Sequence, residues 1–336
     1  MVIKFLKDDL LKECATHVSG IVRPNDIMWV LTVPAIWNDS AKQFMREAAV
    51  QAGLSNDKLK LAVEPETASL FCRHLPIVEG IDISKRKAGS TYMVIDAGGG
   101  TVDITVHQVI EGRRLKEIHK ASGGAWGGTK VDEAYRQFLI SIVGDSVFQK
   151  FVYTHMDDYL DINREFEIKK RKIAALTDSN DLGMDHSNVV IRFPSALKKM
   201  FEEETGEDLQ AAIKQATRSE QIILISDKLR VDARIFLSFF EEATRSIVDH
   251  VKMLFSKPAL RDVSEILLVG GFSESKMLQH AIQKEFIGKH IVVPHEAGMV
   301  VLKGAVVFGH DTGAISERIA KYTYICSWYF YRRRAR

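Results

Sequence analysis

The stretch that decides the fold is "VIDAGGGTVDITVH", residues 94–107, where three glycines in succession separate two apolar runs. After the glycines, Val102, Ile104 and Val106 alternate with polar residues, which is the period of a half-buried strand. The stretch therefore predicts a strand, a tight turn and a second strand. Because Gly98–Gly100 carry no side chains, their backbone N–H groups can approach an anion closely, so the turn is a candidate anion-binding loop.

Two common nucleotide-binding motifs do not fit this spacing. A Rossmann fingerprint requires G-x-G-x-x-G at the start of a helix, and a Walker A loop ends in G-K-[ST]. Asp96, at the end of the first strand, is a candidate to hold Mg²⁺ through water, because Mg²⁺ is usually bound by few carboxylates together with phosphates. Taken alone, the stretch is also compatible with a hairpin turn that binds no ligand.

Composition narrows the class of protein. The chain has 336 residues, which indicates about two domains. Its formal net charge of +2 gives no reason to expect nucleic acid or a membrane surface as a partner. No apolar run approaches the ~20 residues of a spanning helix, and the cysteines, Cys14, Cys72 and Cys326, are far apart, as is typical of a reducing compartment. We therefore expect a cytoplasmic protein without a transmembrane segment.

Strands and helices are expected to alternate, which favours α/β layers around a partly parallel sheet. Strands are predicted at 27–34, 59–64, 92–96, 102–108, 115–124, 188–194, 221–225, 265–270 and 290–294. Helices are predicted at 2–18, 66–75, 232–256, 274–286 and 296–309. Two more are predicted to begin after Asn38-Asp39-Ser40, which offers N-cap chemistry, and at Thr129.

Six segments, taken in order, carry a family resemblance. They are "WVLTVPAIWNDSAKQFMREAAVQAGL" (29–54), "AVEPETASLFCRHL" (62–75), "VIDAGGGTVDITVH" (94–107), "ASGGAWGGTKVDEAY" (121–135), "FEIKKRKIAAL" (166–176) and "ILLVGGFSES" (266–275). Together they resemble the nucleotide-binding domain of the 70-kDa heat-shock protein family, and their residue sequences are most similar to its divergent 12A/12B group. The resemblance covers about residues 1–312, and the ordered set is far more specific than any single motif.

The resemblance implies an α/β fold of the actin-like ATPase type, with two ribonuclease-H-like lobes around a nucleotide cleft. It divides the chain into an incomplete first lobe (1–88), a second lobe (89–293) and a connecting helix that returns to the first lobe (294–312). A subdomain is inserted in the second lobe at about residues 123–245. Residues 313–336 match little of the family and are expected to be a disordered tail.

The resemblance also assigns roles around the glycine turn. The family's second phosphate loop corresponds to Asp96, Gly98–Gly100, Thr101 and Asp103. Glu64 corresponds to its active-site glutamate, beside Mg²⁺ and the attacking water. Glu64, Asp96, Thr101 and Asp103 are therefore the candidate catalytic residues. Read by itself, Glu64 is also typical of a helix N-terminal carboxylate stabilised by the macrodipole.

Three more groups are implied to face the nucleotide: Gly127 and Gly128, the adenosine-side clamp Glu167, Lys170 and Arg171, and the adenosine-side turn Gly270 and Gly271. The clamp residues share one helix face through their i, i+3, i+4 spacing. A solvated basic face and a nuclear import signal are alternative interpretations of this basic run.

At four positions the chain departs from the family pattern. Thr129 and Lys130 stand where the family usually has an acid pair, and Phe272 and Glu274 stand where it has serine and arginine. The first pair of changes is expected to alter closure of the lobes, and the second pair weakens the case for ordinary adenine stacking.

The family's first phosphate loop and catalytic lysine have no counterpart in residues 1–25, and we expect no peptide-binding domain after the connecting helix. We therefore expect a nucleotide-binding domain truncated at both ends, which binds ATP or ADP with Mg²⁺ and hydrolyses ATP weakly or not at all. One alternative is a pseudoenzyme that binds no nucleotide and acts as a protein-interaction module. A sugar-kinase relative is a further alternative, because such kinases share the fold.

Overall fold

The computed structural model describes residues 1–17, 22–73, 86–172, 188–215 and 221–320. The expectations for residues 321–336 and for part of the "KKRKIAAL" run therefore lie outside the described residues. Within the described ranges, no helix combines the length and the apolar character needed to cross a bilayer.

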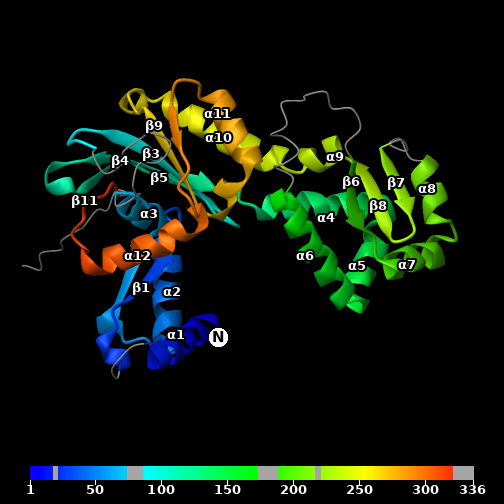
Figure 1. Cartoon of the computed structure of the whole chain (residues 1–336), viewed down its shortest axis with the longest axis horizontal. Coiled ribbons are helices and arrows are strands. Elements are labelled where there is room, and N and C mark those ends of the chain that lie inside the picture. The colour runs from blue at the N-terminus through cyan, green and yellow to red at the C-terminus, as the bar shows by residue number, and fades with distance from the viewer. Residues whose placement is uncertain (18–21, 74–85, 173–187, 216–220, 321–336) are drawn as a thin grey trace, which may run out of the picture.

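A six-stranded mixed sheet lies in the left-hand part of the molecule in Figure 1. Its order is β10 (His290–Val292), β9 (Glu265–Val269), β3 (Thr91–Ala97), β4 (Val102–Val109), β5 (Leu115–Gly124) and β11 (Ile315–Glu317). The predicted strand–turn–strand unit is confirmed, because β3 and β4 pair in antiparallel fashion and the Gly98 N–H donates to the Thr101 carbonyl at 2.9 Å. β9 pairs with β3 in parallel, so the strands predicted at 92–96, 102–108 and 265–270 do share one sheet.

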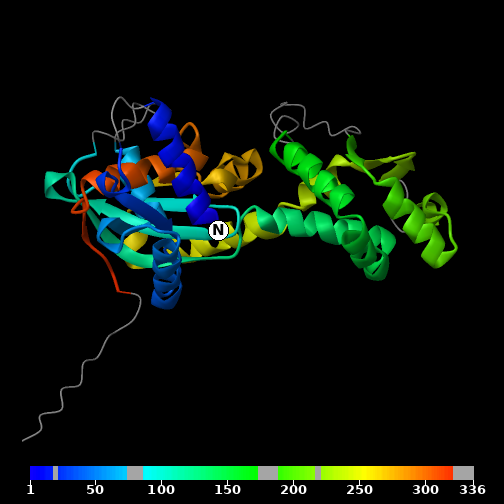
Figure 2. The same cartoon turned by 90° about the horizontal axis from the view of Figure 1, so that it is seen from below.

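Helices cover both faces of this sheet, which explains why β3 and β4 are buried along almost their whole length (Figure 2). One face packs against α10 (Glu241–Phe255) and α11 (Lys276–Glu285). The other face packs against α3 (Glu64–Cys72) and α12 (Val300–His310). The alternation of Val102, Ile104 and Val106 therefore separates two buried faces, not a buried face from a solvated one.

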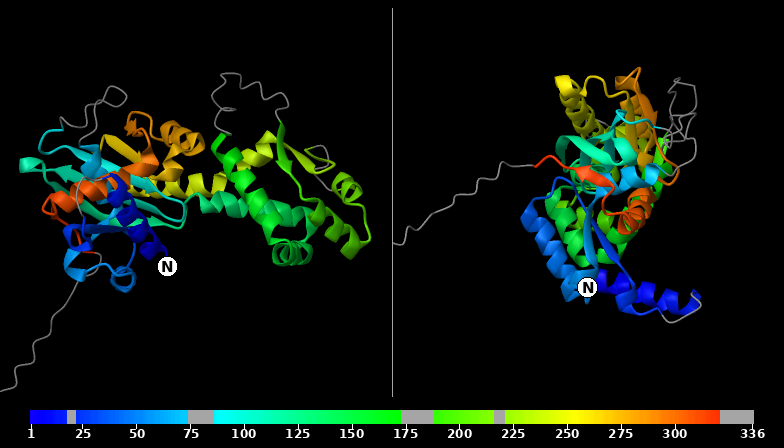
Figure 3. Two further views of the ribbon diagram at one scale, coloured as in Figure 1. Left: turned by 60° about the horizontal axis from the view of Figure 1, so that its bottom comes forward. Right: turned by 90° about the vertical axis from the view of Figure 1, so that its left-hand side faces the viewer.

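A second, two-stranded sheet lies beyond α12 (Figure 3). In it β1 (Trp29–Val33) pairs in parallel with β2 (Leu59–Val63), as the strand predictions at 27–34 and 59–64 require. The segment between them forms α2 (Asp39–Gln51). Of the three residues predicted to offer its N-cap, Asn38 is the cap, and its side chain accepts from the Ala41 N–H at 2.8 Å. The N-terminal α1 (Val2–His17) lies beside α2.

The part of the chain between β5 and α10 extends away from both sheets along the long axis (Figure 1). It contains α4 (Thr129–Val143), α5 (Asp145–Thr154), α6 (Met156–Lys172), α7 (Ser195–Thr205), α8 (Leu209–Gln215) and α9 (Ala233–Ser238). Its three-stranded sheet has the order β6 (Asn188–Arg192), β8 (Lys228–Asp232) and β7 (Ile222–Ile225).

The prediction of one helix over 232–256 is wrong, because the chain forms α9 and α10 with a break at Phe239 and Phe240. Phe239 packs its ring against Tyr135, Phe138 and Phe166 from α4 and α6. The break keeps near-helical backbone angles, so the 3.6-residue pattern of apolar side chains continues across it and conceals it.

The prediction of a disordered tail beginning at residue 313 is also wrong for its described part. Ala314 and Ile315 are buried, and β11 adds to the sheet edge in parallel with β5. Arg318 then forms a two-pronged ion pair with the buried Glu66 of α3 at 2.6 and 2.9 Å. A strand of three residues is too short to show a period of two, so its order comes from contacts that are distant in sequence.

We predict that Gly304→Ala lowers the free energy of unfolding by about 1–3 kcal/mol, the usual cost of forcing extra atoms into a packed contact. A Cβ atom on Gly304 would collide with the Thr67 carbonyl, where α12 crosses α3. Gly309→Ala on the same helix is the control, since its new Cβ meets only the Val30 side chain at 3.2 Å and alanine favours helix. Denaturant unfolding in which both variants match the wild type would contradict the proposed close crossing.

Candidate functional site

The glycine turn between β3 and β4 is held against the start of α4 by backbone contacts. Three hydrogen bonds run from the N–H groups of Gly127–Thr129 to the carbonyls of Gly98–Gly100, with N···O distances of 2.8, 3.1 and 3.3 Å. A Cβ atom on Gly127 would collide with the Gly99 carbonyl, so this approach requires glycine. None of these bonds uses the N–H group of Gly99 or Gly100. The two predicted glycine groups therefore form one structural unit.

Three carboxyl groups converge behind this turn. Asp96 and Asp103 are directly opposite each other in the β3–β4 ladder, and Glu64 is the first residue of α3. Burial, followed by the charge of Asp103, raises the pKa of Glu64 to about 7. Burial and the charges of both neighbours raise the pKa of Asp96 well above its ordinary value. Such mutual repulsion in a desolvated place is typical of a site built for a cation.

Asp96 fits a cation site by a second observation. Its Oδ2 atom is buried and has no hydrogen-bond partner among the described residues. Gly270, with φ +87°, lies so close that a Cβ atom there would collide with Asp96 Oδ1. Within the described residues, no group of three His, Cys, Asp or Glu side chains is placed to hold a metal ion directly. The water-mediated Mg²⁺ at Asp96 remains a prediction.

Asp103 and Thr101 are tied together at the base of the turn. The Ile36 N–H donates to Asp103 Oδ1 at 2.7 Å. Burial raises the pKa of Asp103, while the hydrogen bonds from Ile36 and Thr101 and the charge of Lys42 oppose that rise. Asp103 is thus fixed by the segment after β1, which joins the two sheets at the site.

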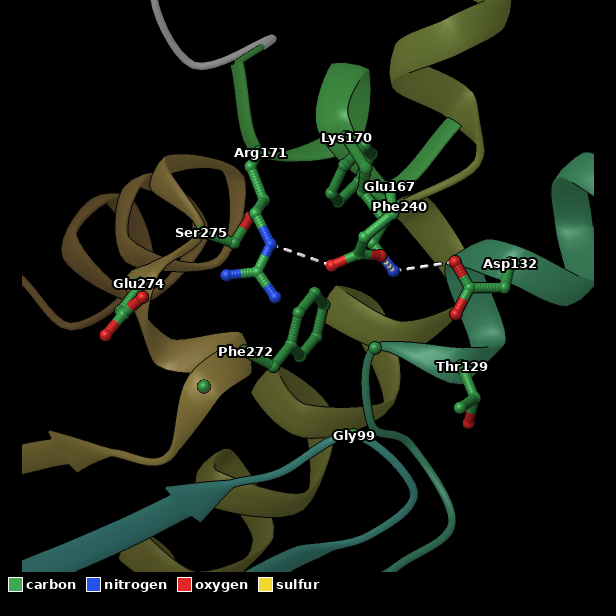
Figure 4. A pocket seen from close by; sticks show the side chains of 12 residues that line it. Gly99, Thr129, Asp132, Glu167, Lys170, Arg171, Phe240, Phe272, Glu274 and Ser275 are labelled. Atoms are coloured by element: carbon green, nitrogen blue, oxygen red, sulfur yellow. Dashed lines mark hydrogen bonds and ion pairs between the residues drawn. The ribbon is translucent and has the colours of Figure 1, made fainter. Parts of the chain in front are cut away.

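A cavity of about 490 Å³ opens on the other side of the glycine turn (Figure 4). It is lined by Gly99, Gly128, Thr129, Asp132, Glu167, Lys170, Arg171, Phe240, Gly271, Phe272, Glu274 and Ser275. Six predicted site residues thus meet at one cavity: Gly99, Gly128, Glu167, Lys170, Arg171 and Gly271. Glu64, Asp96 and Asp103 do not line it and form the adjoining acid cluster.

The clamp residues are already paired with one another. Lys170 Nζ lies 2.6 Å from a carboxylate oxygen of Glu167 and 2.6 Å from Asp132 Oδ1. Arg171 Nε contacts the second Glu167 oxygen at 2.8 Å. The Lys170 side chain is only 11% exposed, so it links α6 to Asp132 of α4 inside the cavity wall. The Arg171 side chain, although paired with Glu167, is 71% exposed and accessible to a ligand.

Sequence reasoning missed Asp132, Phe240 and Ser275 as lining residues. Asp132 stands in the first turn of α4, and its role depends on α6 lying beside it, which no local pattern reveals. Lys130, where the family usually has an acid, forms an ion pair with Glu242 at 2.9 Å. Glu274 is also engaged, because its Oε1 atom accepts from the Gly298 N–H at 3.0 Å.

The six-stranded mixed sheet, with helices on both faces and a glycine hairpin between β3 and β4, agrees with the actin-like ATPase fold. The family model "Hsp70 protein" matches residues 8–180, about half of the chain. The chain therefore belongs to the Hsp70 family, whose nucleotide-binding domains have this fold.

Similarity to individual relatives extends over nearly the whole chain. This chain is 31% identical to heat shock 70 kDa protein 12A of Mus musculus over 373 residues, an alignment that covers 96% of this chain and 54% of the relative. It is also 31% identical to heat shock 70 kDa protein 12B of Homo sapiens over 376 residues, with 96% of this chain and 54% of the relative covered. Chaperone protein DnaK of Thermotoga neapolitana is 27% identical over 324 residues, with 91% and 45% covered. The chain thus spans about half the length of the curated relatives that it matches.

We predict that Glu64→Gln becomes more stable relative to the wild type as the pH rises from about 4.5 to about 7. Below pH 4.5 the carboxyl is protonated in both states; between its ordinary pKa of 4.5 and its folded pKa of about 7, only the unfolded chain releases the proton. Each rise in pH within that window therefore favours unfolding of the wild type, and the difference becomes constant above it.

Denaturant unfolding from pH 5 to 8 measures this effect. Glu133→Gln is the matched control, because hydrogen bonds from Arg136 and Gln137 lower the pKa of Glu133 to about 2 and keep it ionised across the window. A stability difference that stays flat with pH for Glu64→Gln would contradict the raised pKa.

Proposed function

We propose that this chain binds ATP and ADP with Mg²⁺, the phosphates lying on the glycine turn and the adenosine in the adjoining cavity. The observation that carries the proposal is the position of Gly99. It belongs to the turn that faces the acid cluster, and it also lines the cavity that contains the clamp. One nucleotide can therefore reach both the turn and the clamp. Membership of the Hsp70 family supports the same ligand.

Each part of the site has a chemical task in this proposal. The N–H groups of Gly99 and Gly100 would bind phosphate oxygens, as backbone donors in glycine-rich turns do. Asp96 and Asp103 would hold Mg²⁺ through water, which would also offset their mutual repulsion. Glu64 would orient a water near the terminal phosphate. Arg171 would contact the adenosine end, with Lys170 and Glu167 fixing its helix.

We further propose that this chain hydrolyses ATP slowly. Phosphoryl transfer depends on positive charge near the oxygens of the transferred group. Of the charges that shift the pKa values of these three carboxyl groups, Lys42 is positive and opposes the rise at Asp103, while Glu64 and Asp103 are carboxylates that raise the pKa of Asp96. When bound, Mg²⁺ supplies part of the missing charge. Glu64, Asp96 and Asp103 can position water, but they add negative charge where the transition state needs the opposite.

The cellular role is proposed on the same basis. We infer a chaperone-related, stress-associated function in the cytoplasm from family membership and from the wide separation of the cysteines. A chain that bound no nucleotide would instead act as a protein-interaction module, and the titration below separates these two functions.

We predict that labelled ATP and ADP bind the wild-type chain, more tightly with Mg²⁺ than without it. Arg171→Ala should weaken binding by about tenfold, the effect of losing one charge-assisted contact. Arg164→Ala on the same helix is the control, since its side chain is similarly exposed and pairs only locally with Asp161 at 3.2 Å. Absence of binding in the wild type would refute nucleotide binding, and equal affinities in the two variants would refute the clamp.

We predict that steady-state phosphate release is about 100-fold slower than that of the relative DnaK. The reason is that loss of one positively charged group near the transferred phosphoryl group commonly costs 10²–10³-fold in rate. Glu64→Ala supplies the background value. Turnover close to that of DnaK, and abolished in Glu64→Ala, would show that a residue of this chain provides the positive charge that we find lacking.

A further inference from the structure

Glu274 lies at the edge of the cavity, and one of its carboxylate oxygens is already engaged. Its carboxylate accepts a hydrogen bond from the Gly298 N–H at 3.0 Å, in the turn that leads into α12. Figure 4 shows this side chain pointing away from the space between Arg171 and Phe272. A planar ligand in that space would therefore have to find its contacts on other side chains.

Phe272 offers such a contact. It follows Gly270 and Gly271 at the end of β9, and its side chain lines the cavity from below (Figure 4). Its ring packs against Gly128, where an added Cβ atom would lie 3.5 Å from the ring, and only 7% of the residue is exposed. The ring is therefore held in one orientation, with little freedom left to lose when a ligand binds.

Arg171 reaches the same space from the opposite element. It descends from α6 toward the Phe272 ring (Figure 4). Its Nε atom is fixed by Glu167 at 2.8 Å, while its side chain remains 71% exposed. A guanidinium group anchored in this way presents a flat, charged face, which stacks on heteroaromatic rings.

We propose that the base of the nucleotide stacks between the Phe272 ring and the Arg171 guanidinium, so that Phe272 supplies the aromatic face of the base site. This inference rests on the proposed function, since it requires a nucleotide in the cavity. Stacking of a base on an aromatic side chain is favourable for every base, because each has a π face. The phosphate end is held elsewhere, on the glycine turn, so the two ends can be tested separately.

The experiment compares ADP with inorganic tripolyphosphate, which has no base, by titration calorimetry in the presence of Mg²⁺. Phe272→Leu keeps apolar bulk against Gly128 but removes the aromatic face, and it should weaken ADP binding by about tenfold while leaving tripolyphosphate binding unchanged. Phe272→Tyr keeps the aromatic face and should retain ADP affinity within about threefold. Phe255→Leu is the control, because that ring packs with Phe286 away from the cavity.

Three results would overturn the inference. Unchanged ADP affinity in Phe272→Leu, with the wild type binding ADP, would remove the stacking role and leave the proposed function standing. Equal loss of ADP and tripolyphosphate binding would show that Phe272 only maintains the fold. Failure of the wild type to bind either ligand would refute the proposed function and this inference with it.

Discussion

The close backbone contact between Gly98–Gly100 and Gly127–Thr129 is the constraint on which the site depends. It joins the hairpin of the six-stranded sheet to the start of α4, from which the extended part of the chain begins. No side chain is possible at Gly127, because a Cβ atom there would collide with the Gly99 carbonyl. The direction of α4, and with it the position of α6 and the clamp beside the turn, follows from a contact that only glycine permits.

The acid cluster of Glu64, Asp96 and Asp103 destabilises the folded chain, because three carboxyl groups are buried close together. Asp96 and Asp103 occupy facing positions in a buried ladder, where apolar residues would stabilise the sheet better. Glu64 adds a third carboxyl from the first turn of α3, and burial raises the pKa of all three groups. A fold tolerates such mutual repulsion chiefly where function requires it, so the cluster supports a cation-dependent role more strongly than any single residue does.

The features that the sequence predicted correctly are those encoded over short distances. The glycine hairpin, the Asn38 cap and the shared face of Glu167, Lys170 and Arg171 each depend on residues within a few positions of one another. The misses depend on contacts that are remote in sequence. Asp132 meets Lys170 from another helix, and β11 is ordered by β5 about 200 residues earlier in the chain. The local spacing of apolar and polar residues does not indicate either contact.

The two ends of the site are also linked through α12. Glu274, at the edge of the cavity, binds the Gly298 N–H in the turn that begins this helix. α12 then crosses α3 so closely that Gly304 touches the backbone of Thr67, three residues after Glu64. Close-packed interiors have low compressibility and transmit strain from one helix to the next. A displacement at the cavity edge that moved α12 would therefore move α3, and the carboxyl at its N-terminus would change position relative to Asp96.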